Sequence, residues 1–344
     1  RRADRLEDGR RRAGLAQFRT KTGRLTAWGP AANGGVYALA ASGSTLFLGG
    51  EFSAIGGVAR SRLAAVDLAP GSTLAWDPGA DHAVSTLAVA GGLVFAGGGF
   101  TAVGGRPRNY LAAIDITTGT VSAWDPAVDT RVVAVAASAS GTVAGGFFRI
   151  ANVLPRANLA AIDLTTKHIT DWSPGANGAV QAMTRLGSRL YVGGQFSSVG
   201  GQPRSLLAAF DLATGALNSW STELRGGFNF GGSEWSPQVL ALASNAAVVY
   251  VAGKFTSIGG QPRGHLAALD PVTALPTSWD PLTGISPAEF AVLTVSSDES
   301  HAYVATKGLS FLAWDGATGS LTQVKFANDL PRRVLASGGR VYVA

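Results

Sequence analysis

The residues best suited to ligand binding or catalysis lie together in one stretch, between Trp220 and Val239. This stretch reads STELRGGFNFGGSEWSPQ and adds 11 residues to a junction that takes 8 residues between Trp28 and Val36. Its acidic, basic and aromatic members are Glu223, Arg225, Phe228, Phe230, Glu234 and Trp235. Aromatic and arginine side chains dominate binding energy where a pocket excludes water. The segment 221–238 is therefore predicted to bind a ligand, with contacts centred on its arginine and aromatic residues.

The two glutamates of this segment allow an alternative function. Glycosidases use a pair of carboxylates roughly 5–10 Å apart, one as the acid and the other as base or nucleophile. Glu223 and Glu234 could serve in this way in an enzyme, hydrolase or lyase, that acts on a polysaccharide. Two acids on one flexible loop are poorly held for that chemistry. We therefore expect binding without catalysis and assign no catalytic residue.

The rest of the chain carries no recognisable catalytic or metal-binding motif. There is no H-E-x-x-H, no G-x-S-x-G and no Walker loop, and the four histidines are scattered. The chain has no cysteine, which excludes disulfides, thiolate metal sites and thiol catalysis. We expect neither a metal nor a cofactor.

An acidic residue recurs at the end of the strand-like piece L-A-A-x-D. Asp followed three or four residues later by Thr-Gly is typical of a turn whose carboxylate accepts backbone N–H groups. We therefore interpret the series as structural rather than as a ring of metal ligands. Its members are Asp67, Asp115, Asp163, Asp211, Asp270 and Asp315, and Arg19 stands at this place in the first copy.

An arginine also recurs, eight residues after a phenylalanine, in the loop F-x-x-x-G-G-x-x-R. One arginine per copy at a fixed place is typical of a loop brace, with donors for neighbouring carbonyls. A repeated ligand site is the alternative. The arginines are Arg60, Arg108, Arg156, Arg204 and Arg263.

Four copies end in the pattern W-x-P-x-x-[ND]. Pro and Asn or Asp favour a turn into the next copy. The tryptophan is expected to pack as an apolar wedge between copies, and an exposed platform for sugars is the alternative. The pairs are Trp28 with Asn33, Trp76 with Asp81, Trp124 with Asp129 and Trp172 with Asn177.

These positions belong to a repeat whose closing tryptophans lie 48 residues apart, from Trp28 to Trp220. A period of this size, with four strand-like pieces per copy, is typical of propeller blades. Three of the pieces occur seven times each, and the chain starts at a third piece and stops at a second. We therefore predict an all-β, seven-bladed β-propeller with four strands per blade. Residues 12–28 and 334–344 are expected to form a shared closing blade that leaves no major sheet edge open.

The repeat also resembles a known family. The segment GGQFSSVGGQPRSLLAAFDLATGALNSW at Gly193–Trp220 recurs as GGGFTAVGGRPRNYLAAIDITTGTVSAWDP at Gly97–Pro126. This unit resembles the bacterial propeller repeats called delta-60 repeats, a domain of unknown function in secreted and surface proteins. The resemblance covers about residues 12–344. It implies a propeller and an extracellular or cell-surface location, and it leaves the ligand open.

Charge and hydropathy narrow the range of partners. The net charge is +6 over 344 residues, and half of it lies in Arg1–Arg12. There is no basic stripe with interleaved aromatic residues, so nucleic acid is not expected. No apolar run approaches the ~18 residues of a membrane span, so membrane insertion is not expected. We expect one domain over residues 1–344, as a monomer or as part of a larger multidomain chain.

A second departure from the repeat lies near the end of the chain. Tyr303 to Asp315 spans 12 residues where Tyr191 to Asp211 spans 20, and the arginine-containing loop is missing. Blade junctions and loops between second and third strands share one face of a propeller. A cleft is therefore expected between the segment 221–238 and the shortened loop Lys307–Phe311. Neutral insertion and decay of a late repeat are the alternative. The favoured function is a non-catalytic secreted or cell-surface propeller that binds a glycan or protein ligand on this face.

Overall fold

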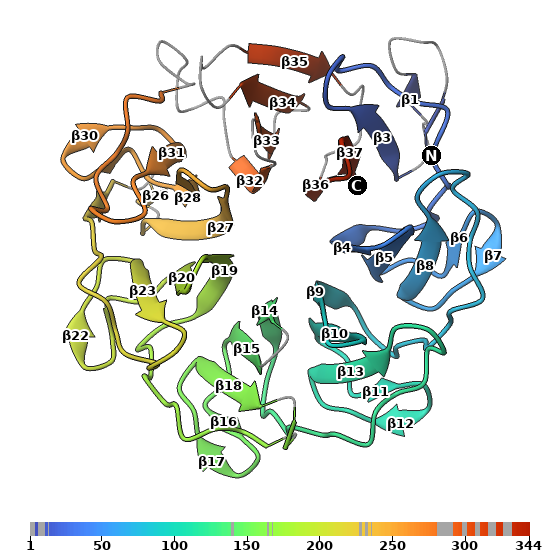
Figure 1. The fold of residues 1–344 in the computed structure, drawn as a ribbon, viewed down its shortest axis with the longest axis horizontal. Coiled ribbons are helices and arrows are strands. Elements are labelled where there is room, and N and C mark those ends of the chain that lie inside the picture. Colours follow the sequence, from blue (N-terminus) through green and yellow to red (C-terminus); the bar gives the residue numbers. More distant parts are fainter. Residues whose placement is uncertain are drawn as a thin grey trace. The chain divides into compact units, whose positions relative to one another are not determined.

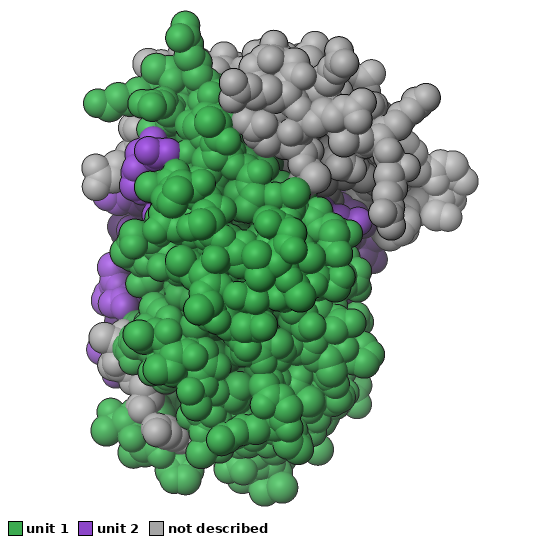
Figure 2. Space-filling model, turned by 90° about the vertical axis from the view of Figure 1, so that its right-hand side faces the viewer, with its two compact units in different colours: residues 1–175, 342–344 green, residues 176–341 purple. Residues whose placement is uncertain are grey.

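The structure is a computed structural model, and it describes most of the chain. The described residues are 4–5, 11–12, 14–138, 141–163, 165–166, 168–226, 229–230, 233–234, 236–280, 292–297, 301–306, 310–315, 321–325 and 332–344. Within these ranges the regular structure is antiparallel β-sheet and no helix occurs, so the expected all-β class is confirmed. The chain divides into two compact units: unit 1 holds residues 1–175 and 342–344, and unit 2 holds residues 176–341 (Figure 2).

Unit 1 contains three successive three-stranded sheets, and the middle strand of each is the second in the chain. The first strands β4, β9 and β14 lie side by side (Figure 1). The sheets are β4 (Val36–Ser42), β5 (Thr45–Gly50) and β8 (Leu63–Asp67); β9 (Val84–Ala90), β10 (Leu93–Gly98) and β13 (Leu111–Asp115); and β14 (Val132–Ala137), β15 (Gly141–Gly146) and β18 (Leu159–Asp163).

A short hairpin connects the second and third strands of each of these sheets, on the side away from the first strands (Figure 1). The hairpins are β6 (Ala54–Ile55) with β7 (Val58–Ala59), β11 (Ala102–Val103) with β12 (Arg106–Pro107), and β16 (Ile150–Ala151) with β17 (Leu154–Pro155). The start of the chain adds the pair β1 (Asp4–Arg5) and β2 (Arg11–Arg12), followed by β3 (Ala16–Arg19).

Unit 2 repeats this arrangement. Its sheets are β19 (Val180–Leu186), β20 (Arg189–Gly194) and β23 (Leu207–Asp211); β27 (Gln238–Ser244), β28 (Val249–Lys254) and β31 (Leu266–Leu269); and the four-stranded β32 (Val292–Ser297), β33 (His301–Thr306), β34 (Ser310–Asp315) and β35 (Leu321–Lys325). The short strands are β21 (Ser198–Val199), β22 (Gln202–Pro203), β24 (Leu224–Arg225), β25 (Asn229–Phe230), β26 (Ser233–Glu234), β29 (Ser257–Ile258) and β30 (Gln261–Pro262). The chain ends with β36 (Val334–Ser337) and β37 (Arg340–Val343).

Small residues in the second and third strands let neighbouring sheets approach closely. The Ala-Ala pair of the third strand is fully buried at Ala64–Ala65 and again at Ala208–Ala209. A Cβ atom added to Gly49 of β5 would lie 2.6 Å from Cγ1 of Val84 on the next sheet. A side chain larger than hydrogen at Gly49 would force these two sheets apart.

The fourth strand-like piece of each copy differs from its prediction. Apart from the four-stranded sheet in unit 2, it pairs with the third strand through one bridge, as between Val66 and Thr73. Hydrogen bonds from the N–H groups of Asp67 and Leu74 flank that bridge. The chain then leaves the sheet, because the following tryptophan inserts its indole ring toward the next copy.

Candidate functional site

The structure places the segment 221–238 next to a loop of the sheet that follows it. Leu224 of β24 pairs with Ile258 of β29, and Arg225 pairs with Ser257. Further along, β25 and β26 form a hairpin in which Phe230 pairs with Ser233. Junction and loop therefore lie on the same face of unit 2.

The structure describes only some of the predicted site residues. Glu223 and Arg225 are described with their side chains, and Phe230 and Glu234 are described as backbone in β25 and β26. Phe228 and Trp235 lie outside the described residues. The shortened loop opposite the segment is described only from Ser310 onward, where β34 begins, so the predicted cleft between the two is not part of the described structure.

Glu223 and Arg225 form an exposed ion pair. Nε of Arg225 lies 2.8 Å from Oε1 of Glu223, and the two side chains are 72% and 56% exposed. The hydrogen bond from Glu223, followed by its charge, raises the pKa of the Arg225 guanidinium above its ordinary value. An arginine side chain with this exposure can bind a carboxylate, a hydroxyl pair or a backbone carbonyl of a ligand.

The same position in the regular copies carries an Asn or Asp that serves as a clamp. The side chain of Asn177, five residues after Trp172, accepts hydrogen bonds from the N–H groups of Ser197 and Ser198, both at 2.9 Å. Asn33, Asp81 and Asp129 accept the same pair of N–H bonds at distances of 2.8–3.2 Å. The predicted local turn is therefore a tie between two segments about 20 residues apart.

Arg225 takes the place of this clamp, five residues after Trp220. The backbone now holds the loop instead, because the N–H of Thr256 donates to the carbonyl of Arg225 at 3.0 Å. The Thr256 hydroxyl donates to the same carbonyl at 3.3 Å. The exchange keeps the junction attached and leaves the side chain at this position free to face solvent.

The electrostatics of the clamp are clearest at Asp81. Partial burial raises its pKa, but hydrogen bonds from the Thr101 hydroxyl and from the N–H groups of Ala102 and Thr101 outweigh that effect. With a smaller contribution from His82, they lower the pKa of Asp81 from 3.8 to about 2. The carboxylate is thus held ionised for a structural purpose, and it is not poised to transfer protons near neutral pH.

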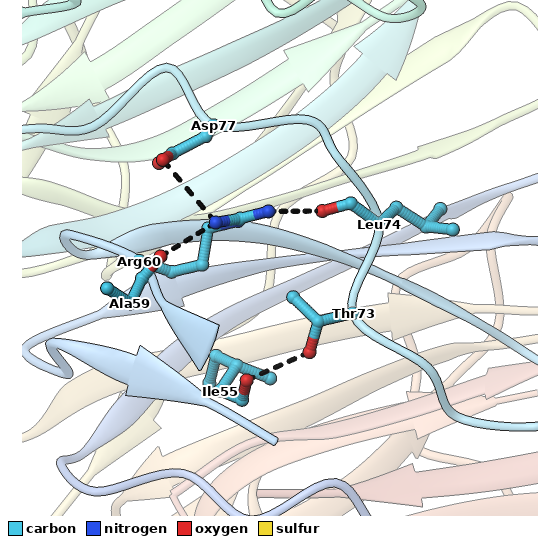
Figure 3. Close-up of polar contacts among 6 residues, drawn as sticks. All are labelled: Ile55, Ala59, Arg60, Thr73, Leu74 and Asp77. Carbon is cyan, nitrogen blue, oxygen red and sulfur yellow. Dashed lines mark hydrogen bonds and ion pairs between the residues drawn. The ribbon is translucent and has the colours of Figure 1, made fainter. Parts of the chain in front are cut away.

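The repeated arginines brace their loops as predicted. Nη1 of Arg60 donates to the carbonyl of Ala59 at 2.7 Å, Nη2 donates to the carbonyl of Leu74 at 2.6 Å, and Asp77 lies 3.4 Å away (Figure 3). The other four arginines also donate to the carbonyl just before them and to the carbonyl 14 residues later. They are Arg108, Arg156, Arg204 and Arg263.

The repeated aspartates close hairpin turns, also as predicted. Oδ1 of Asp115 accepts the N–H groups of Thr117 and Thr118 at 3.0 and 2.7 Å, together with the Thr118 hydroxyl. These bonds, led by the Thr118 N–H, lower the pKa of Asp115. The same geometry occurs at Asp163, Asp211 and Asp270, and Asp67 accepts one N–H. The turn that follows Asp315 lies outside the described residues.

Three of the closing tryptophans connect one copy to the next, which agrees with their predicted role as wedges. Trp220 is 1% exposed and meets Tyr191 edge to face, with ring centroids 4.9 Å apart. Its indole N–H donates to the carbonyl of Asp270 in the following copy at 3.0 Å. Trp28 and Trp76 make the equivalent bonds to the carbonyls of Asp67 and Asp115. Buried rings of this kind cannot serve as sugar platforms.

One structural feature could not be predicted from the sequence. The residue just before the third strand has a left-handed backbone in five copies, with φ between 63° and 67°. Its N–H donates to the carbonyl of the loop phenylalanine, and its own carbonyl accepts the N–H of a glycine at the end of the second strand. The residues are Arg62, Tyr110, Asn158, Leu206 and His265. Five unlike side chains at one position give no sequence signal for this conformation.

In the part of the chain that the structure describes, no three histidine, cysteine, aspartate or glutamate side chains gather as a metal site would require. His265 is buried, and its Nδ1 lies 3.0 Å from the carbonyl of Gly253. The same part of the chain contains no long apolar helix of the kind that crosses a bilayer.

Comparison with known proteins identifies the fold and not a family. No family model matches the chain, and no curated protein matches it in sequence. Solved structures match over most of the chain. The WD40 repeats of RRP9 share 10% sequence identity with a TM-score of 0.61, and cover 98% of this chain and 89% of that one. A chain of the mitotic checkpoint complex is 12% identical with a TM-score of 0.56, covering 88% and 81%. The computationally designed protein Ika8 is 15% identical with a TM-score of 0.55, covering 91% and 97%.

Together with the all-β topology, the likeness to a WD40 structure places this chain among the β-propellers. At these identities the likeness concerns the fold alone.

Proposed function

We propose that this protein is a non-catalytic, secreted or cell-surface β-propeller that binds a glycan or protein ligand through its loop face. The ligand site is the segment 221–238, with Arg225, Phe228, Phe230 and Trp235 as the main contacts and Glu223 and Glu234 at their side. Such a scaffold offers loops for recognition while the sheets stay rigid.

One observation carries this proposal, namely the replacement of the clamp at Arg225. In the regular copies the equivalent side chain is used to hold the loop. At Arg225 the backbone carbonyl does this instead, and the guanidinium is exposed and oriented by Glu223. The junction at Arg225 thus keeps its backbone structure while its polar side chain is exposed, and an exposed side chain can contact a ligand.

The hydrogen bonds of the other polar residues favour binding over catalysis. The repeated arginines and aspartates form their hydrogen bonds with the backbone. Glu223 is exposed and paired with Arg225, so it lacks the burial that turns a glutamate into a general acid. The alternative of a polysaccharide-acting enzyme built on Glu223 and Glu234 is therefore less favoured.

The architecture that we propose has seven blades, with the last one made from residues 12–28 and 334–344. Supporting it, Trp28 and Tyr342 of unit 1 meet edge to face with ring centroids 5.2 Å apart. This is the same pairing that Trp76 makes with Phe47 inside one copy. The resemblance to delta-60 repeats supports an extracellular location, and the match to a chain of the mitotic checkpoint complex shows that a related fold takes part in a protein assembly.

The proposal can be tested by ligand screening followed by mutation. The purified chain is screened on a glycan array and on an array of extracellular protein domains, and hits are measured by calorimetry. Arg225→Ala and Trp235→Ala should each weaken the best hit by about tenfold or more, since such residues anchor interfaces. Glu223→Gln and Glu234→Gln should leave binding largely intact.

Lys21→Ala serves as the control, because Lys21 is exposed and lies in unit 1. The melting temperatures of all variants should match that of the parent. A hit that is bound equally by Arg225→Ala and Trp235→Ala would place the site elsewhere. Turnover of a polysaccharide that disappears in Glu234→Gln would establish the enzyme instead.

A further inference from the structure

A second candidate surface belongs to unit 1, whereas the segment 221–238 belongs to unit 2. It is the loop Phe147–Pro155 of unit 1, which contains the hairpin β16–β17. The described residues include eight exposed large apolar side chains, and four of them lie in this loop. The four are Phe147, Ile150, Val153 and Leu154, and Val153 is 87% exposed. Apolar side chains gathered in this way on a surface indicate an interaction site.

At three of these four positions the large apolar side chain is specific to this copy of the loop, and the place of Leu154 is taken elsewhere by Val58, Arg106, Gln202 and Gln261. The residue in the place of Val153 is glycine in the other four loops of this type, at Gly57, Gly105, Gly201 and Gly260. The place of Phe147 is taken there by Glu51, Gly99, Gln195 and Lys254, and the place of Ile150 by Ala54, Ala102, Ser198 and Ser257. Since the repeat forms the same hairpin without them, these apolar residues are not needed to build the fold.

The loop also retains backbone strain that the other copies avoid. Asn152 and Val153 have φ values of 47° and 58°, where the other loops have glycine. A β-branched residue with positive φ is a genuine outlier. The strain extends to the neighbouring blade junction, where Ala127 has φ 42°. The carbonyl of Pro126, the residue before Ala127, accepts the N–H of Asn152 at 2.7 Å. Backbone strain of this kind clusters at active sites, ligand clamps and switch regions.

The charges around the hairpin are positive. Arg149 is exposed, and the guanidinium of Arg131 lies 5.5 Å from the centre of the Phe147 ring. The sequence from Phe147 to Asn158 contains no acidic residue. The nearby carboxylate of Asp129 is engaged by the N–H groups of Arg149 and Ile150. Exposed cations therefore border an apolar tip.

We propose that the loop Phe147–Pro155 is a docking element for a protein partner that presents an apolar pocket bordered by carboxylates. The side chains of Ile150, Val153 and Leu154 fill the pocket, and Arg149 pairs with its acidic rim. This surface lies in unit 1, so the inference does not depend on the proposed ligand site in unit 2.

The charges and the geometry favour this partner over two others. Two copies of the chain that met through this loop would bring their Arg149 side chains together, and like charges repel. Insertion into a lipid surface would bury the Arg131 guanidinium that lies over the Phe147 ring. It would also bury the amide of Asn152 beside Val153, and both polar groups are costly to bury in hydrocarbon. A protein pocket can leave such groups at its polar rim.

The test uses a phage-displayed library of random 12-residue peptides, selected on the folded chain. The enriched peptides should combine Leu, Ile or Phe with Asp or Glu. Their synthetic versions should bind the double variant Asn152→Gly/Val153→Gly at least about tenfold more weakly than the parent, since a few apolar and arginine anchors supply most of the binding energy. This variant restores the Gly-Gly of the other loops, so its melting temperature should equal or exceed that of the parent.

Val272→Ser is the matched control, because Val272 is 68% exposed and lies in unit 2. It should bind the selected peptides like the parent. The proposal is overturned if no peptide is enriched, or if the selected peptides bind the double variant and the parent equally. It is also overturned if the loop mediates self-association in sedimentation velocity, or binding to phosphatidylcholine/phosphatidylserine vesicles, and the double variant loses either property.

Discussion

The junctions at Asn177 and Arg225 are each held to the following loop by hydrogen bonds, but different atoms accept them. Asn177 holds the next loop through its side-chain carbonyl, which accepts the N–H groups of Ser197 and Ser198. At Arg225 the backbone carbonyl accepts the N–H of Thr256, and the side chain turns to Glu223. The comparison teaches that the repeat can do without the side-chain clamp as long as a backbone acceptor replaces it.

The largest expected effect concerns the tryptophan that stands five residues before the clamp position in both junctions. Trp220→Ala removes an almost fully buried ring, its contact with Tyr191 and its hydrogen bond to Asp270. We expect a loss of about 3–5 kcal/mol in the free energy of unfolding, measured by urea denaturation. A loss below about 1 kcal/mol would mean that the junction before Arg225 is a loosely attached appendage.

A smaller effect should separate the two junctions. Asn177→Ala leaves two backbone N–H groups without their acceptor and is expected to cost about 1 kcal/mol. Arg225→Ala should change the free energy of unfolding by less than about 0.5 kcal/mol, because the backbone carbonyl still holds Thr256. Equal losses in the two variants would contradict the comparison.

The smallest effect distinguishes acidic clamps from amide clamps. The folded-state pKa of Asp81 is about 2, below its ordinary value of 3.8, so the ionised form favours the folded state. This contribution is complete above roughly pH 4 and is lost as the pH falls toward 2. Asp81→Asn keeps the acceptor, as Asn33 does, and should flatten the pH dependence of stability between pH 4 and 2. An unchanged slope in the denaturation midpoints would show that Asp81 is not the titrating group.

Much of the fold could be predicted because local patterns decide it. The strand beginning at Val36 alternates buried and half-buried residues, and the Leu-Ala-Ala piece is buried on both faces. The turn role of Asp115 and the brace role of Arg60 also follow from short spacings that place donor and acceptor within one loop. Blade number, closure and the single domain of residues 1–344 stay predictions.

The candidate site was harder to predict because it depends on contacts between distant segments. The partner of Asn177 lies about 20 residues further on, so its role as a clamp is invisible in the pattern W-x-P-x-x-N. The fact that the Arg225 side chain no longer holds the loop can be recognised only once the clamp at Asn177 is known. The apolar loop at Val153 could have been noticed from the loss of Gly-Gly, but its exposure and its positive φ required the folded backbone.

The indole bond that joins one copy to the next has a consequence for how the chain is made. Trp28 and Trp76 donate to carbonyls 39 residues further along, at Asp67 and Asp115. At synthesis rates of about 5–20 residues per second, each indole leaves the ribosome roughly 2–8 s before its acceptor exists. The newest copy is therefore always unfinished during translation, with its largest apolar ring exposed, and the growing chain needs protection from aggregation at that moving end.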